Sequence, residues 1–114
     1  MNTPDPQSMA AAASVHERLN RALVALATGR GDVRSRLEPA AMALDPLQAT
    51  DFPAQLQADF RWIMEQLQRY EPNRGEGRIK ATLQRIQNST GEKIAHRIVE
   101  LHEKVQLIRS GSTC

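Results

Sequence analysis

Residues 56–70, LQADFRWIMEQLQRY, carry the pattern that decides the fold class. Leu56, Phe60, Ile63, Leu67 and Tyr70 recur there at spacings of four, three, four and three residues. At about 100° per residue, these side chains share one narrow stripe of an α-helix. The stretch therefore predicts an amphipathic helix that contributes one face to a hydrophobic core.

The flanking residues extend this helix to about 53–70. Pro53 suits the first helical position and Asp51 can cap the helix. A second stripe with the same spacings lies in residues 90–109 and consists of Ile94, Ile98, Leu101, Val105 and Ile108. Two such stripes fit the shallow packing angle of a helical bundle.

Shorter patterns predict the other helices. Ser14 and Glu17 have the spacing of a capping box, which starts a helix over about 15–28. Asp32 can cap a helix over 33–44, and Pro39 inside it predicts either a kink or two shorter pieces.

A further helix over about 78–88 precedes the C-terminal stripe. Ser89 and Glu92 again have capping-box spacing, and Gly91 lies between them. We therefore expect either two helices separated near Gly91 or one long helix bent there.

The composition fits an all-α domain, a compact bundle of four to five helices. Hydrophobic residues make up 40% of the chain, which is enough to bury a core, and β-branched residues are few. We expect a disordered tail over 1–13, one domain over 14–109 and a frayed end over 110–114. No signal peptide or membrane span is predicted, and the single cysteine, Cys114, cannot form an internal disulfide. Arginine outnumbers lysine twelve to three, which is typical of GC-rich bacterial genomes, so we expect a cytoplasmic bacterial protein.

A binding function is the leading hypothesis, and no cofactor or metal is predicted. Trp62 lies about 120° from the apolar stripe of its helix, beside Arg69, and Val99 and Leu107 lie on the polar side of the C-terminal helix. Either a neighbouring element covers Trp62, or these four residues bind a protein partner or a second copy in a homodimer, since Trp and Arg dominate interface hot spots. A small interaction or regulatory protein without enzymatic activity is therefore the first interpretation.

Nucleic-acid binding is the alternative. Six basic and two acidic residues fall within 74–97, although no aromatic residues are expected near them for base stacking. The candidate contacts are Arg78, Lys80, Arg85, Lys93 and Arg97.

The segment HRIVELH, residues 96–102, raises a third interpretation. Arg97 and His102 form R-x4-H, which resembles in spacing the R-x4-6-H motif of small helical ribonucleases of the HEPN type. That resemblance implies RNA cleavage by Arg97 and His102. On an unbroken helix, however, the two side chains diverge by about 140°, and His96 lies on the polar side, where helix-stabilising pairs with Glu92 and Glu100 are expected.

Overall fold

The structure, a computed structural model, describes the backbone of residues 6–111 and the side chains of residues 13–111. Within this range the chain forms helices and no strand, which confirms the predicted all-α fold. The elements are α1 (Pro6–Thr28), α2 (Val33–Leu44), the 3-10 helix η1 (Ala49–Asp51), α3 (Ala54–Leu67), α4 (Arg78–Arg85) and α5 (Asn88–Arg109). None of the described helices is both long and apolar enough to cross a membrane.

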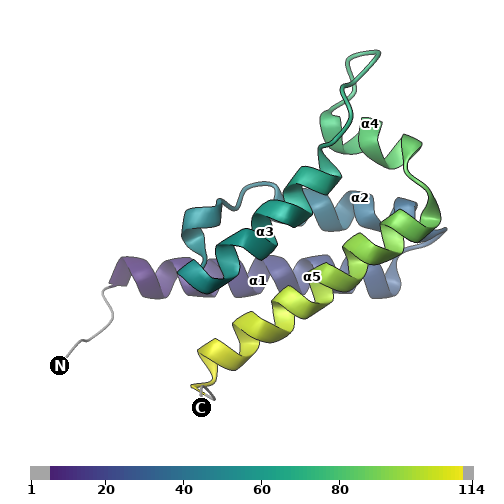
Figure 1. Cartoon of the computed structure of the whole chain (residues 1–114). Helices are drawn as coiled ribbons and strands as arrows, with labels where there is room; N and C mark the ends of the chain where they lie inside the picture. Colours follow the sequence, from purple (N-terminus) through teal and green to yellow (C-terminus); the bar gives the residue numbers. More distant parts are fainter. Residues whose placement is uncertain (1–5, 112–114) are drawn as a thin grey trace.

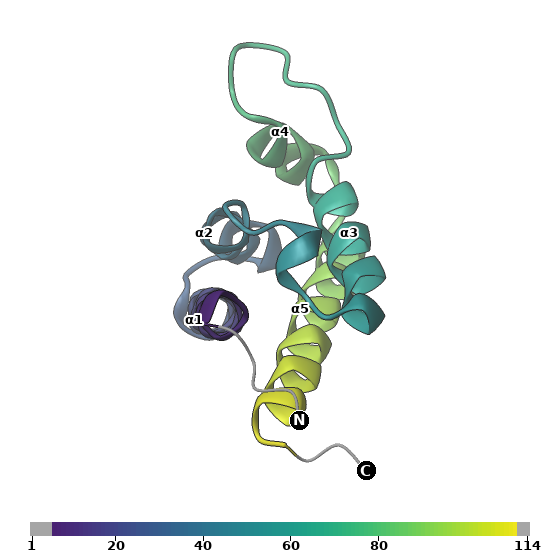
Figure 2. The ribbon, with the colours of Figure 1, turned by 90° about the vertical axis from the view of Figure 1, so that its left-hand side faces the viewer.

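The helices form two crossed pairs. In Figure 2, α1 and α2 are seen along their axes, whereas α3 and α5 run across the view. Because α5 packs against α1, α2 and α3, it connects the two pairs (Figure 1). The short α4 lies at one end, where it contacts α2 and α3.

The two predicted stripes supply much of the core. Leu56, Phe60, Ile63 and Leu67 of α3 are buried, as are Ile94, Ile98, Leu101 and Val105 of α5. The ends of both stripes, Tyr70 and Ile108, are only partly buried. Burial of an apolar side chain contributes roughly 1.5–3 kcal/mol, so these eight positions stabilise the fold substantially.

The predicted start of the first helix is wrong. α1 begins at Pro6 and not near residue 15, so Ser14 lies inside a helix and forms no capping box there. The intervening residues include an alanine run, and alanine has the highest helix propensity. The predicted tail over 1–13 is therefore helical from Pro6 onward, while residues 1–5 and 112–114 lie outside the described residues.

Helix α2 follows its prediction at the N-terminus. The backbone N–H of Ser35 donates to the Asp32 carboxylate over 3.1 Å, and this bond, together with Arg34, holds the pKa of Asp32 below its usual value. Pro39 lies inside a single helix and does not divide it.

The predicted N-terminus of α3 needs correction. Pro53 is the residue before the helix, and Asp51 accepts a hydrogen bond from the Gln48 backbone within η1 instead of capping α3.

The role predicted for Gly91 is also wrong. The chain breaks at Ile86 and Gln87, which have extended backbone, and Gly91 is buried in the first turn of α5. A Cβ atom at Gly91 would lie 2.9 Å from Cγ1 of Val33 and 3.4 Å from Cδ1 of Leu37. Glycine is therefore present because α5 approaches α2 closely, not because the helix ends.

Four arginines hold the C-terminal ends of helices other than their own. The last carbonyls of an α-helix have no partner within the helix, and a guanidinium group can satisfy them. In each case Nη1 donates to a main-chain oxygen: Arg36 to Leu26 of α1 (2.8 Å), Arg18 to Ala43 of α2 (3.2 Å), Arg78 to Gln68 after α3 (3.3 Å) and Arg34 to Ile86 after α4 (3.2 Å). Four of the twelve arginines thus serve the fold.

Candidate functional site

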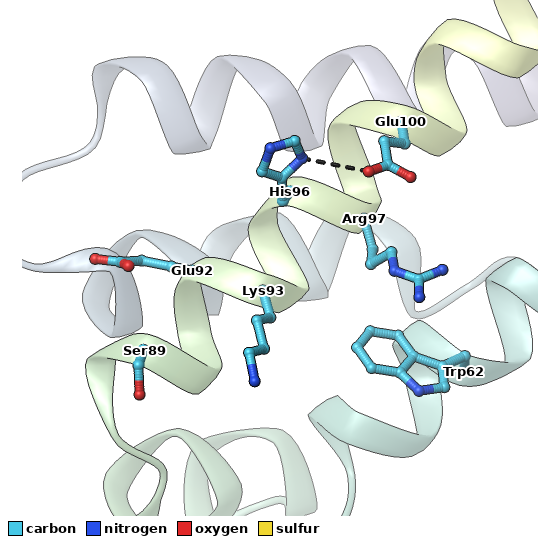
Figure 3. Close-up of a pocket in the computed structure, with 7 residues that line it drawn as sticks. All are labelled: Trp62, Ser89, Glu92, Lys93, His96, Arg97 and Glu100. Atoms are coloured by element: carbon cyan, nitrogen blue, oxygen red, sulfur yellow. Dashed lines mark ion pairs between the residues drawn. The ribbon is translucent and has the colours of Figure 1, made fainter.

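A shallow pocket of about 550 Å³ lies between α3 and the N-terminal half of α5. Trp62 is its contribution from α3, and α5 contributes Ser89, Glu92, Lys93, His96, Arg97 and Glu100 (Figure 3). We call these seven residues the α3–α5 pocket. Trp62 is partly buried, so neighbouring elements cover one side of the ring, while its other side lines the pocket. Binding of a partner by Trp62 stays a prediction.

The centre of the α3–α5 pocket is a contact between Arg97 and Trp62. The guanidinium carbon of Arg97 lies 5.0 Å from the centre of the indole ring, which is within the range of a cation–π interaction. Their register follows from the packing of α3 on α5, which also joins Lys104 to Asp59 by a 3.0 Å ion pair. The residue number in α3 rises from Asp59 to Trp62, while the number of the contacting residue in α5 falls from Lys104 to Arg97. The two helices are therefore antiparallel.

The charges of the α3–α5 pocket are separated in space. Arg97 lies over Trp62 and Lys93 leaves α5 on the same side, whereas Glu100 turns toward His96 and Glu92 points away from Trp62 (Figure 3). Nδ1 of His96 is 3.4 Å from a Glu100 oxygen, so that carboxylate has a neighbour on its own helix, as the spacing predicted. Neither Lys93 nor Arg97 forms an ion pair with a carboxylate of the described residues.

The four residues proposed for partner binding do not form one surface. Trp62 lines the α3–α5 pocket, but Arg69 lies exposed beyond the end of α3 and outside it. Val99 and Leu107 are 36% and 54% exposed, as expected for the polar side of α5. However, Val99 is two residues from Arg97 and so points about 160° away from it, and Leu107 is ten residues, or about 15 Å, along the axis.

The five proposed nucleic-acid contacts are also divided. Lys93 and Arg97 share the α3–α5 pocket, while Lys80 lines separate pockets near α2 and the loop before α4. Arg78 pairs with Glu71 and donates to the end of α3. Arg85 lies 5.5 Å from the centre of the Tyr70 ring.

The expectation that this basic segment lacks aromatic neighbours is wrong. Tyr70 and Trp62, both distant in sequence, lie beside Arg85 and Arg97. Segment composition could not show this, because Trp62 of α3 and Tyr70, which follows α3, supply the rings, and α4 and α5 supply the cations.

The two residues of the R-x4-H motif face different neighbours. Arg97 contacts α3, whereas the His102 ring lies 5.3 Å from the His16 ring of α1, measured between ring centres. The structure therefore does not bring Arg97 and His102 together, in agreement with their helical angle.

His16 and His102 form a second cluster, between α1 and α5. Nε2 of His16 donates to the side-chain oxygen of Gln106, and Nε2 of His102 is buried with no hydrogen-bond partner among the described residues. Burial, and after it the neighbouring His16, lowers the pKa of His102, against a smaller opposite effect of Glu103. His102 is thus partly buried. The participation of His16 was missed, although His16 lies about 60° from Leu19, on the edge of the α1 stripe.

Metal binding has no evident site in this part of the chain. Nowhere in residues 13–111 do three or more His, Cys, Asp or Glu side chains gather in a way that could hold an ion.

In comparisons with protein-family models, curated proteins and solved structures, none matches this chain.

Proposed function

We propose that this chain is a small binding protein without enzymatic activity, whose partner contacts the α3–α5 pocket. The observation that carries the proposal is the contact of Arg97 with Trp62 in that pocket. Trp and Arg are the residues most enriched at the energetic centres of protein interfaces.

The surroundings support binding rather than catalysis at this position. A nucleophilic serine needs a base within hydrogen-bond reach, and no hydrogen bond joins Ser89 of the pocket to His96 in the described chain. The pocket is shallow and open, and its cations and ring lie on two helices that pack against each other. A bacterial, cytoplasmic setting remains part of this proposal.

The test is affinity capture from a bacterial lysate by the wild-type chain and by the variants Trp62→Ala and Arg97→Glu. We expect a defined protein to be recovered by the wild type and lost with both variants, with or without nuclease treatment. Met42→Ala is the matched control, because Met42 is an apolar side chain 58% exposed on α2, outside the α3–α5 pocket.

Thermal unfolding of each variant accompanies the capture. Arg97 is exposed, so Arg97→Glu is expected to leave stability nearly unchanged and to separate lost binding from lost folding. Recovery of the same protein by wild type and both variants would refute the proposal.

Nucleic-acid binding is the second candidate, because Arg85 and Arg97 each lie over an aromatic ring. A single-stranded nucleic acid would stack bases on such rings and bind less tightly as salt rises. Nucleic acid captured at low salt, released at high salt and lost on nuclease treatment would favour this candidate.

A further inference from the structure

The α3–α5 pocket also indicates the chemistry of its partner. Lys93 and Arg97 approach the exposed side of Trp62 without a carboxylate partner of their own in the described chain. Four surface cations of the described chain do form ion pairs with carboxylates: Arg21 with Glu17, Arg34 with Asp32, Arg78 with Glu71 and Lys104 with Asp59. The cations beside Trp62 are therefore available to an incoming anion.

The nearby carboxylates do not neutralise this position from within. Glu92 and Glu100 are on the same helix as Lys93 and Arg97, but Glu100 lies 3.4 Å from His96, and in Figure 3 the Glu92 side chain points away from Trp62. Neither carboxylate is directed at the Trp62 ring. A carboxylate next to an apolar side chain could therefore meet Trp62, Lys93 and Arg97 without displacing an existing ion pair of the two cations.

We propose that the α3–α5 pocket binds an acidic peptide segment of a partner protein, with a carboxylate held by Lys93 and Arg97 and a neighbouring apolar side chain placed against Trp62. This inference rests on the proposed function and specifies its partner class. A guanidinium–carboxylate contact is among the stronger hydrogen-bonded pairs and has defined geometry. Trp62 supplies the apolar area, and its partly buried position keeps the ring in place for the partner.

Nucleic acid is the competing occupant, and the charge arrangement disfavours it. The other proposed nucleic-acid contacts lie outside the α3–α5 pocket: Arg78 is paired with Glu71, Lys80 lines other pockets and Arg85 lies over Tyr70. A discrete anionic group fits the site better than a repeating phosphate chain.

The test measures binding of three labelled 15-residue probes by fluorescence anisotropy. They are a peptide of alternating Glu and Leu blocks, the same peptide with Gln in place of Glu, and single-stranded oligothymidine of the same length. We expect the acidic peptide to bind the wild-type chain at least roughly tenfold more tightly than the Gln peptide, and to weaken as salt is raised.

Two substitutions of equal charge change locate the effect. Lys93→Glu is expected to weaken binding of the acidic peptide at least roughly tenfold. Lys80→Glu, on the exposed surface of α4, is expected to leave it unchanged. Both lysines are exposed, so neither variant is expected to disturb the core.

Three results would overturn the inference: equal binding of the acidic and Gln peptides, no binding of either, or equal losses with Lys93→Glu and Lys80→Glu. Tighter binding of oligothymidine, weakened by both variants, would assign the surface to nucleic acid. These outcomes are distinct from failure of the proposed function, which is tested by protein capture with Trp62→Ala. A protein captured through Trp62 but indifferent to Lys93→Glu would retain the binding role and reject the acidic partner.

Discussion

Gly91→Ala is the substitution for which the structure gives the sharpest expectation. In an unstrained helix interior, replacing Gly by Ala stabilises by about 1 kcal/mol, because alanine has the higher helix propensity. Here the new Cβ would lie 2.9 Å from Cγ1 of Val33, closer than real Cβ contacts. Overpacking of a core costs roughly 1–3 kcal/mol. The clash therefore outweighs the propensity gain, and we expect a net loss of about 1 kcal/mol.

Urea unfolding followed by far-UV circular dichroism measures this change. The midpoint should fall while the slope stays constant, since a constant slope shows that the denatured and native states keep their compactness. A domain of this size has roughly 5–15 kcal/mol of stability, so the variant should remain folded.

The same substitution in a Val33→Ala background separates the clash from every other effect. Removing Cγ1 of Val33 takes away the closest atom, and Leu37 Cδ1, the end of a flexible side chain at 3.4 Å, then remains the nearest neighbour. We expect Gly91→Ala to become stabilising by roughly 0.5–1 kcal/mol in that background. The coupling between the two sites should then be about 1.5–2 kcal/mol. Equal or greater stability of Gly91→Ala in the wild-type background would refute the close approach of α5 to α2.

Two further predictions concern stability. Arg36→Met keeps the apolar stem but leaves the Leu26 carbonyl without its 2.8 Å donor, so the free energy of unfolding should fall by about 1 kcal/mol. Arg30→Met, at an exposed arginine, is the control. Equal effects of the two substitutions would contradict the capping role of Arg36. The lowered pKa of His102 means that, just below pH 6.5, the unfolded chain binds more protons than the folded chain. The unfolding free energy should therefore fall as the pH drops from about 7 to 5. His102→Gln should reduce the dependence of the unfolding free energy on pH, whereas His96→Gln, at an exposed histidine of the same helix, should not. An unchanged pH dependence in His102→Gln would refute the assignment of this effect to His102.

The fold was predictable where each helix carried its own signal. The stripes of α3 and α5 mark buried residues because helical periodicity is local, and Asp32 marks a helix start because its cap bond spans three residues. Gly91 was misread because the contact that explains it is distant in sequence. A glycine in a helical pattern indicates a break when only its sequence neighbours are considered, but here the cause is Val33, which is 58 positions earlier in the chain.

The candidate site was predictable residue by residue but not as an arrangement. Trp62 and Arg97 were both identified, yet they were assigned to different functions, because their meeting depends on the register between α3 and α5. The same limitation hid the His16–His102 contact. Periodicity gives the angle of a side chain around its own helix and contains no information on which neighbour it meets.

The four arginines that cap the C-terminal ends of other helices affect how the protein unfolds locally. Arg18 of α1 holds the end of α2, and Arg36 of α2 holds the end of α1, so these two helices are fastened at both ends of their contact. Separating them exposes two carbonyls at once, and neither helix can fray at its C-terminus without releasing a guanidinium that belongs to the other. Amide hydrogens near the ends of α1 and α2 should therefore exchange with solvent at similar rates, as one cooperative unit. An isolated α1 or α2 peptide would lack its terminal donor and should be less helical than the same segment in the intact chain.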